Sequence, residues 1–281
     1  MSIIVSYSEV YKFQTCQRQY FYNNILGKHP IIDNEAMATG TKGHKLLQTF
    51  YTGLREGMSK EESLEAAHHK AQKISTENGG IDFGLLKAWT LVANYIRATD
   101  FTAEAIIVED RFLLPASALS PDPIFQDVQI GFTPDLVLRR KGNKSDVEDA
   151  KFVQRSWSKS KLNRFPQAKL YQIFLEKMGY EVSRSVIRFF NFQTNKVFPQ
   201  YYTLGNAERL NLIHDFMSGV KDVVRYKTLP AHLLPLAPRT MNYTNCQYCP
   251  YEFPCSLEAE GKDASKTLAT QYKQSNYDYT R

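Results

Sequence analysis

Charged residues interrupt two short apolar runs of this 281-residue chain, IGFTPDLVL and DVEDAKFV. Strands that are buried on one face normally exclude Asp and Glu. The RRKGNK segment between the runs contains a Gly-Asn pair, which favours a tight hairpin turn. Because side chains alternate between the two faces of a strand, a turn centred on Gly142 or Asn143 places Asp135 opposite Asp149 or Lys151. The sequence therefore predicts a β-hairpin that gathers these three side chains on one face.

A third acidic residue, Glu109, lies in the preceding strand-like run AEAIIVEDRFL. Three converging carboxylates provide oxygen ligands, which Mg²⁺ or Mn²⁺ prefers in octahedral geometry. An ion held there would polarise a phosphate and help to deprotonate a water molecule. Lys151 would orient the nucleophile and stabilise the charge that develops on the phosphate. The pattern thus indicates a metal-dependent phosphodiesterase centre.

Two alternatives remain open for these residues. Taken singly, Asp and Lys at strand ends usually form surface salt bridges. The apolar surroundings favour the metal site, because buried charges need partners. Burial of Lys151 would lower its pKa and let it take part in proton transfer, which the sequence does not establish. Glu148 is expected to point to the opposite strand face from Asp149 and is not counted as a ligand.

Helical and strand periodicities follow one another in an order that predicts an α/β fold in one domain over 1–261. Its parts are a mainly helical segment at about 6–99, a catalytic core at about 100–205 and a cysteine-bearing segment at about 206–261. A polar tail, 262–281, is expected to be mobile. Expected helices start at Ser6 and near Thr41 and cover 59–78, 84–99, 165–178 and 206–226. Expected strands cover 103–113, 127–138, 145–153, 181–193 and 196–203.

Local signals support the first two helices. Ser6 and Glu9 have the spacing of a capping box, and Cys16 falls on the buried stripe of the helix that follows. Gly40 and Gly43 permit close approach of another segment beside His44. By itself His44 is most simply a solvent-exposed residue near a helix start.

The four cysteines are distributed as one plus three. Cys16 is alone, whereas Cys246, Cys249 and Cys255 lie within ten residues. In a reducing compartment such a group indicates metal ligation before disulfides. Four thiolates can hold a structural zinc ion or an iron–sulfur cluster, and unligated core cysteines are a third possibility. A shared metal group would join the two ends of the chain and stabilise the fold.

A net charge of +6 suits a polyanionic partner, because basic side chains bound to phosphates release counterions. Basic and aromatic residues alternate just after Lys151, in a segment that could guide a nucleic-acid strand into the site. Solvated loop charges explain the same segment equally well. The predicted DNA-binding residues are Arg155, Trp157, Lys159, Lys161 and Arg164.

No stretch approaches the roughly 18 continuous apolar residues that a membrane-spanning helix requires. The first residues show neither the charged nor the apolar region of a secretory signal. We therefore expect no membrane partner and an intracellular protein, in the cytoplasm, on the nucleoid or, for a viral protein, in the host cytoplasm.

The hairpin residues resemble the signature of the PD-(D/E)XK nucleases, and specifically of their RecB-like branch. Pro134 and Asp135 resemble the first signature pair, and Asp149-Ala150-Lys151 resembles the acidic-x-Lys element that follows it. The resemblance covers about residues 6–257. It implies a restriction-endonuclease-like core, with a mixed central β-sheet flanked by helices, plus a helical N-terminal segment and a C-terminal cysteine cluster.

Further motifs of the branch have counterparts here. His44 is similar to its N-terminal metal-binding histidine, and Glu109 to the acidic residue of its first core strand. Gln167 and Tyr171 match its QxxxY motif, although one packed helix face would explain this pair equally well. The resemblance implies metal binding by His44, Glu109, Asp135 and Asp149, and a role for Gln167 and Tyr171 in positioning DNA and the site.

The cysteine layout resembles that of the iron–sulfur nucleases of this branch, such as the CRISPR-adaptation exonucleases and the AddB nuclease domain. The resemblance implies a 4Fe–4S cluster, with structural Zn²⁺ as the alternative. It also implies a Mg²⁺- or Mn²⁺-dependent deoxyribonuclease, specifically a single-strand DNA exonuclease in recombination, repair or replication. Its partners would be DNA with free ends and a helicase or recombination protein, since the GxxxxGK[ST] motif does not occur. The alternatives are a structure- or site-specific endonuclease and a non-catalytic DNA-binding protein of a recombination complex.

Overall fold

A computed structural model of the chain describes residues 2–31, 35–77, 80–140, 144–155, 157–163, 165–240 and 243–275. The chain forms two compact units, whereas the sequence predicts one domain over 1–261. Unit 1 consists of Met1–Asp33, Leu113–Phe132 and Asn211–Arg281. Unit 2 consists of Asn34–Phe112 and Thr133–Leu210.

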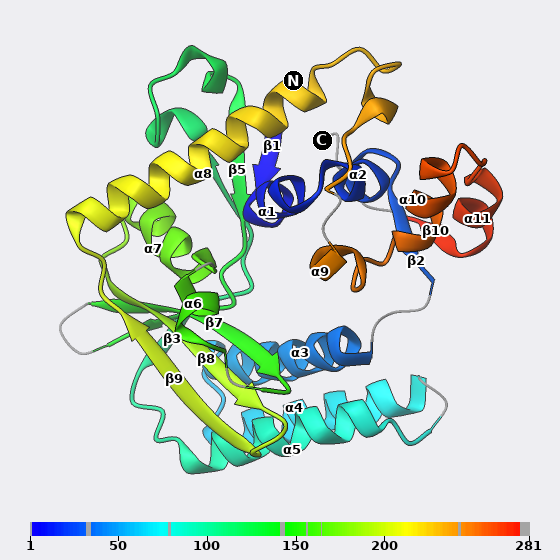
Figure 1. Cartoon of the computed structure of the whole chain (residues 1–281). Helices are drawn as coiled ribbons and strands as arrows, with labels where there is room; N and C mark the ends of the chain where they lie inside the picture. The colour runs from blue at the N-terminus through cyan, green and yellow to red at the C-terminus, as the bar shows by residue number, and fades with distance from the viewer. Residues whose placement is uncertain are drawn as a thin grey trace. The chain divides into compact units, whose positions relative to one another are not determined.

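Unit 2 is built on a five-stranded sheet of order β3-β6-β7-β8-β9 (Figure 1). The pair β7 and β8 is parallel, and the other neighbours are antiparallel. A parallel pair needs a crossover connection, which here contains a helix. This mixed sheet flanked by helices confirms the predicted fold class. The strands are β3 Glu104–Val108, β6 Leu136–Arg139, β7 Ser145–Val153, β8 Val182–Asn191 and β9 Lys196–Tyr202.

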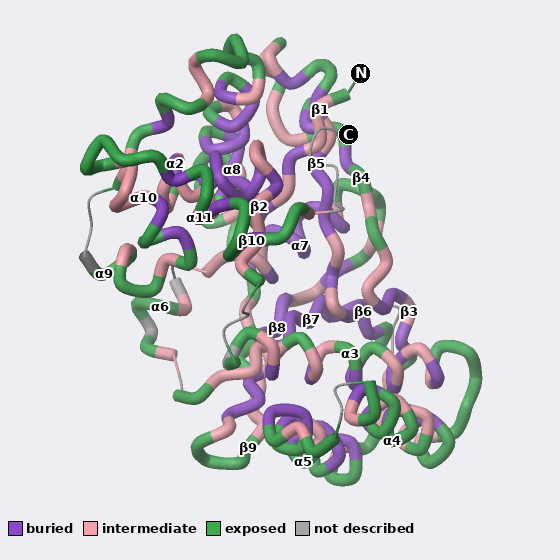
Figure 2. The backbone as a smooth tube through the Cα atoms, turned by 90° about the vertical axis from the view of Figure 1, so that its right-hand side faces the viewer, coloured by how far each residue is buried: buried purple, intermediate pink, exposed green. Residues whose placement is uncertain are grey.

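Helices cover both faces of this sheet. On one face α3 Glu35–Arg55, α4 Lys60–Glu77 and α5 Phe83–Ala98 form an apolar core with residues such as Leu136, Ala150 and Phe190. On the other face lie α6 Lys159–Asn163 and α7 Gln167–Lys177, where the apolar cluster of Ala168 and Phe189 forms. The first six residues of β7 are buried (Figure 2). Consecutive side chains of β7 therefore face different helical layers.

The register of the hairpin agrees with the prediction. Leu136 lies opposite Glu148 and Leu138 opposite Asp146, so even residues face even ones and odd face odd. The register extrapolates to Asp135 opposite Asp149. The predicted turn at 142–143 lies outside the described residues.

Two of the predicted strands have the wrong bounds, because each is divided into two strands in the structure. The run at 127–138 is broken around Pro134, which has no N–H to donate to a sheet. Its first half, β5 Val128–Phe132, joins a separate three-stranded sheet of order β1-β5-β4 in which β1 and β5 are parallel. The run at 103–113 is also divided, because β3 ends at Val108 and Phe112–Pro115 form β4. In addition, α3 begins at Glu35 rather than near Thr41.

The N-terminal part of unit 1 begins with β1 Ile3–Ser6 and α1 Tyr7–Thr15. The capping box is confirmed, since the Ser6 hydroxyl accepts from the Glu9 N–H and the Glu9 carboxylate accepts from the Ser6 N–H. The helix does not continue through Cys16, whose backbone is extended at φ −164°. Cys16 therefore lies at a break rather than on a continuous helical stripe, and α2 Gln17–Tyr20, the π-helical turn η1 Phe21–Ile25 and β2 Lys28–Pro30 follow.

The last part of unit 1 differs from the mobile tail expected after residue 261. Residues Ser265–Thr270 form α11, and β10 Tyr272–Gln274 pairs antiparallel with β2. Residues 276–281 lie outside the described ranges. No helix that the structure describes is both long and apolar enough to cross a membrane. The remaining elements are η2 Ala116–Ala118, η3 Pro123–Phe125, α8 Asn206–Lys227, η4 Leu234–Leu236, α9 Tyr243–Cys246 and α10 Glu252–Ala259.

Candidate metal centre and cysteine site

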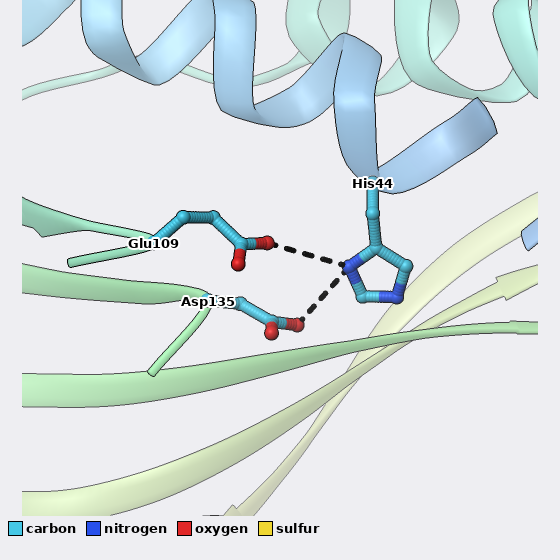
Figure 3. A group of neighbouring side chains, drawn as sticks. All are labelled: His44, Glu109 and Asp135. Atoms are coloured by element: carbon cyan, nitrogen blue, oxygen red, sulfur yellow. Dashed lines mark ion pairs between the residues drawn. The ribbon is translucent and has the colours of Figure 1, made fainter. Parts of the chain in front are cut away.

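Three predicted metal ligands converge in unit 2 (Figure 3). His44 comes from α3, Glu109 follows β3 and Asp135 precedes β6. One ligand atom from each lies within 4.8 Å of the others. The Nδ1 atom of His44 is 3.3 Å from Asp135 Oδ2 and 3.9 Å from Glu109 Oε1. One nitrogen and two oxygens at this spacing match a divalent cation such as Mn²⁺ or Mg²⁺.

The backbone around the two carboxylates fixes their directions. Glu109 adopts φ +54°, a left-handed conformation that costs a non-glycine residue about 1–2 kcal/mol. Its N–H donates to the carbonyl oxygen of Asp135 at 3.2 Å, which ties the ends of the two strands together. The Oδ2 atom of Asp135 accepts from the N–H of Ala150 at 2.7 Å. Strained backbone of this kind gathers at functional sites, where the surrounding structure holds it in place.

The position of His44 depends on a close approach of α3 to β7. A Cβ atom at Gly43 would lie only 2.3 Å from the ring of Phe152, whereas at Gly40 the nearest Phe152 atom would be 3.7 Å away. The Phe152 ring stacks on Phe190 with centroids 4.6 Å apart and meets the His44 ring edge-on at 5.5 Å. The predicted close approach beside His44 is therefore confirmed at Gly43, and not at Gly40.

A second set of predicted site residues lies between β7 and α7. The Nζ atom of Lys151 is 3.0 Å from Asp149 Oδ1 and 2.7 Å from Oδ2. It also donates to Gln167 Oε1 at 3.2 Å, and Gln167 Nε2 donates to the hydroxyl of Tyr171 at 3.0 Å. The QxxxY pair thus supports the lysine. Asp149 does not belong to the three-ligand group within 4.8 Å, because its carboxylate is turned to Lys151.

Crowding of these groups changes their proton affinities. Burial, reinforced by the neighbouring Asp135 and Asp149, raises the pKa of Glu109 to about 7. Burial raises the pKa of Asp149 to about 6, although Lys151 acts in the opposite direction. Burial also acts to lower the pKa of Lys151, but the carboxylates of Asp149 and Asp135 outweigh it and hold that pKa above its ordinary value. Burial therefore does not lower the pKa of Lys151 below its ordinary value, and the alternative of a lowered pKa gains no support.

Glu148 follows the alternation of β7 and lies on the opposite strand face from Asp149, where it lines one pocket with His44, Glu109 and Asp135. It has a partner that the sequence did not reveal. Both carboxylate oxygens of Glu148 accept from Arg188, from Nε and Nη2, at 2.7 Å each. The guanidinium also lies 5.0 Å from the ring centroid of Tyr95, whose hydroxyl is 2.8 Å from that of Tyr51. Glu148 is not part of the group within 4.8 Å, since its carboxylate is paired with Arg188, which only the fold brings to it.

The predicted DNA-binding segment is only partly described. Arg155 and Lys161 are exposed. Trp157 packs on Phe189 with ring centroids 5.3 Å apart, and the Nζ atom of Lys161 lies 4.4 Å from its ring. Trp157 therefore belongs to an apolar cluster of unit 2. The side chain of Lys159 and all of Arg164 lie outside the described residues.

Unit 1 brings the four cysteines together. Cys16, Cys246, Cys249 and Cys255 line one cavity of about 300 Å³, each is half-buried, and none forms a disulfide. Burial raises the pKa of Cys249 to about 11, and the other three cysteines add to this effect. The predicted meeting of Cys16 with the C-terminal trio is present. The break after α1 turns Cys16 toward this cavity.

A family model of the PD-(D/E)XK nuclease superfamily matches residues 4–256. None of the curated proteins matches the chain. Among solved structures, one named "Crystal structure of SSO0001" is 12% identical, covers 89% of this chain and 84% of its own, and has a TM-score of 0.41.

Proposed function

This chain belongs to the PD-(D/E)XK nuclease superfamily, and on that premise we propose that it hydrolyses phosphodiester bonds of DNA with a divalent metal ion. The observation that carries the proposal is the convergence of His44, Glu109 and Asp135 within 4.8 Å. The Lys151 ammonium is held in the same unit by Asp149 and Gln167. The site thus combines a group of metal ligands with a fixed cation.

The donor set fits the proposed ion. His44 Nδ1 and the carboxylates of Glu109 and Asp135 would hold it, and Asp149 would be a further ligand. The Oδ2 atom of Asp149 is buried and receives no hydrogen bond of normal geometry from the described residues, although Lys151 Nζ lies 2.7 Å away. Mg²⁺ prefers oxygen ligands only, so the imidazole favours Mn²⁺ over Mg²⁺. The bound ion supplies polarisation of the phosphate and a water of lowered pKa.

The protein's own residues would then act on the scissile phosphate. Lys151 stabilises negative charge on its oxygens, since its raised pKa keeps the ammonium charged. Gln167 and Tyr171 keep the ammonium in place through the hydrogen-bond chain that begins at Lys151. Arg155, Trp157, Lys159, Lys161 and Arg164 remain the residues we propose to guide the DNA strand.

Cleavage of end-labelled single-stranded DNA with Mn²⁺ or Mg²⁺ tests this activity. Replacing one ligand, Asp135→Asn, should reduce the rate by at least about 10²-fold, because a catalytic metal supplies several kcal/mol of charge stabilisation. The matched control is Glu104→Gln, which removes an exposed carboxylate of the same unit that pairs with Arg139. Metal-dependent cleavage that survives in Asp135→Asn contradicts the assignment. A wild-type chain that binds DNA without cutting it supports the non-catalytic alternative.

We further propose that the enzyme attacks single strands from an end, as a recombination, repair or replication exonuclease. This finer assignment rests on the likeness of the cysteine layout to iron–sulfur exonucleases. Linear and closed circular single-stranded DNA of one sequence separate the alternatives. An exonuclease degrades only the linear form, whereas cutting of the circle identifies an endonuclease. A helicase partner would have to open duplex substrates.

For the cysteine site we propose a 4Fe–4S cluster in preference to zinc. All four cysteines are described, yet no three of their sulfur atoms lie within 4.8 Å of one another. Zinc–sulfur bonds of about 2.3 Å would require sulfur atoms about 3.8 Å apart in a tetrahedron. The wider spacing and the cavity of about 300 Å³ suit a larger group. Iron, sulfide and zinc analysis of anaerobically purified protein tests this, and stoichiometric zinc without iron refutes it.

A further inference from the structure

Two arginines line the cavity of unit 1 that the four cysteines share. Arg18 lies in α2, just after Cys16, and Arg239 lies in the loop before α9. The Nη2 atoms of both arginines donate to Oε2 of Glu258, that of Arg239 at 3.3 Å. The hydroxyl of Tyr22 donates to the same oxygen at 2.5 Å. Glu258 therefore anchors both guanidinium groups at the cavity.

Each arginine keeps one buried N–H group without an acceptor. The Nε atoms of Arg18 and Arg239 are buried and have no hydrogen-bond partner in the described part of the chain. Other groups of Arg18 are engaged, since Nη1 donates to the carbonyl of Pro235 and the guanidinium lies 5.2 Å from the Tyr22 ring centroid. A buried donor without an acceptor is unfavourable, and each one in a folded protein needs an explanation, such as a bound ion or ligand. Two such donors from the lining of one cavity indicate an acceptor that binds in it.

The charges around the cavity suit an anionic acceptor. Two guanidinium groups and the Glu258 carboxylate leave one positive charge. A second carboxylate on the lining, Glu252, is exposed, and its Oε1 accepts from Ser256. A group that binds four thiolates brings negative charge into the cavity, where a buried charge needs a partner. Among the described residues that line the cavity, the two arginines are the cations available for it.

We propose that Arg18 and Arg239 are part of the cofactor site and donate Nε hydrogen bonds to the sulfur atoms of a thiolate-ligated iron–sulfur cluster. This inference rests on the proposed identity of the cofactor as iron–sulfur. Hydrogen bonds to sulfur and nearby charge both set the potential of such clusters. Reduction adds one electron from an external donor, so fixed cations favour the reduced form. The two arginines thus raise the reduction potential and help to retain the cluster.

The test compares Arg239→Gln with Lys262→Gln in the full chain, purified without oxygen. Both substitutions remove one positive charge from unit 1, but Lys262 is exposed, pairs with Glu260 and does not line the cavity. We expect Arg239→Gln to lower the ratio of reduced to oxidised cluster at a given potential at least tenfold, about 59 mV for one electron. Lys262→Gln should match the wild type in a spectroscopic redox titration.

The outcomes are distinguishable. Wild-type potential in an Arg239→Gln chain with full iron content overturns the proposal. If Arg239→Gln does not retain iron, the reduction potential of Arg239→Lys is measured instead, because lysine keeps the positive charge and lacks the Nε donor. A potential below that of the wild type supports the hydrogen bond, and an unchanged potential refutes it. If the wild-type protein contains zinc and no iron, the cofactor is not an iron–sulfur cluster and the proposal fails with that premise. Metal analysis of the wild-type protein shows this before any variant is compared.

Discussion

The substitution Gly43→Ala tests whether close packing of α3 against Phe152 positions His44. Gly43 is buried in the helix and its φ is not positive, so alanine suits its backbone. The added Cβ would nevertheless lie 2.3 to 2.6 Å from three atoms of the Phe152 ring. That ring cannot move freely, because it stacks on Phe190 at 4.6 Å. Either the ring or the helix must shift, and His44 is the next residue of that helix.

The magnitude follows from two opposing terms. Alanine is favoured over glycine inside a helix by about 1 kcal/mol. At Gly40 the nearest atom to a new Cβ is 3.7 Å away, an ordinary contact, so Gly40→Ala should stabilise the chain by about 0.5–1 kcal/mol. At Gly43 overpacking adds a cost of about 1–3 kcal/mol. We therefore expect the free energy of unfolding of Gly43→Ala to be about 1–3 kcal/mol lower than that of Gly40→Ala.

Urea unfolding followed by circular dichroism measures this difference in stability. Calorimetric titration with Mn²⁺ measures the effect of each substitution on metal affinity. Displacement of His44 should weaken Mn²⁺ binding in Gly43→Ala at least tenfold, while Gly40→Ala should bind as the wild type does. If Gly43→Ala equals Gly40→Ala in both stability and metal affinity, the close approach does not position the histidine.

Three further perturbations test other parts of the structure. Arg188→Met leaves Glu148 buried without its partner and should lower the free energy of unfolding by about 3–5 kcal/mol. Adding Glu148→Leu should recover much of this loss, because no buried charge is then left unpaired. Equal free energies of unfolding for the single and double variants would contradict this. In metal-free protein the pKa of Glu109 is raised from 4.5 to about 7. The stabilisation that this carboxyl group contributes is therefore complete below pH 4.5 and is lost as the pH rises through 7, which lowers the free energy of unfolding by at most about 3 kcal/mol. Unfolding midpoints across this range measure the loss, and Glu109→Gln should flatten the profile. Cys249→Ser should lose its metal group and unfold at lower urea than the wild type, and unchanged metal content would refute its role as a ligand.

Features that depend on neighbouring residues could be predicted from the sequence. The capping box at Ser6 needs only Glu9 three residues on, and helices such as α4 and α5 follow from apolar periodicity. The hairpin parity that brings Asp135 toward Asp149 follows from the length of the turn, because side chains alternate along a strand. These interactions are short in sequence, so local chemistry is sufficient to specify them.

Other features depend on which distant segments of the chain contact each other, and the local sequence pattern does not specify those contacts. The run at 127–138 has the same apolar alternation whether it lies in one sheet or two, and only its pairing with β1 or β7 separates the halves. Arg188 looks like any strand arginine until β8 brings it to Glu148, forty residues earlier in the chain. Arg18 and Arg239 reach one cavity because Glu258 binds both. Residue types and spacing thus predict the candidate ligands of both sites, whereas long-range packing decides which charges and donors surround them.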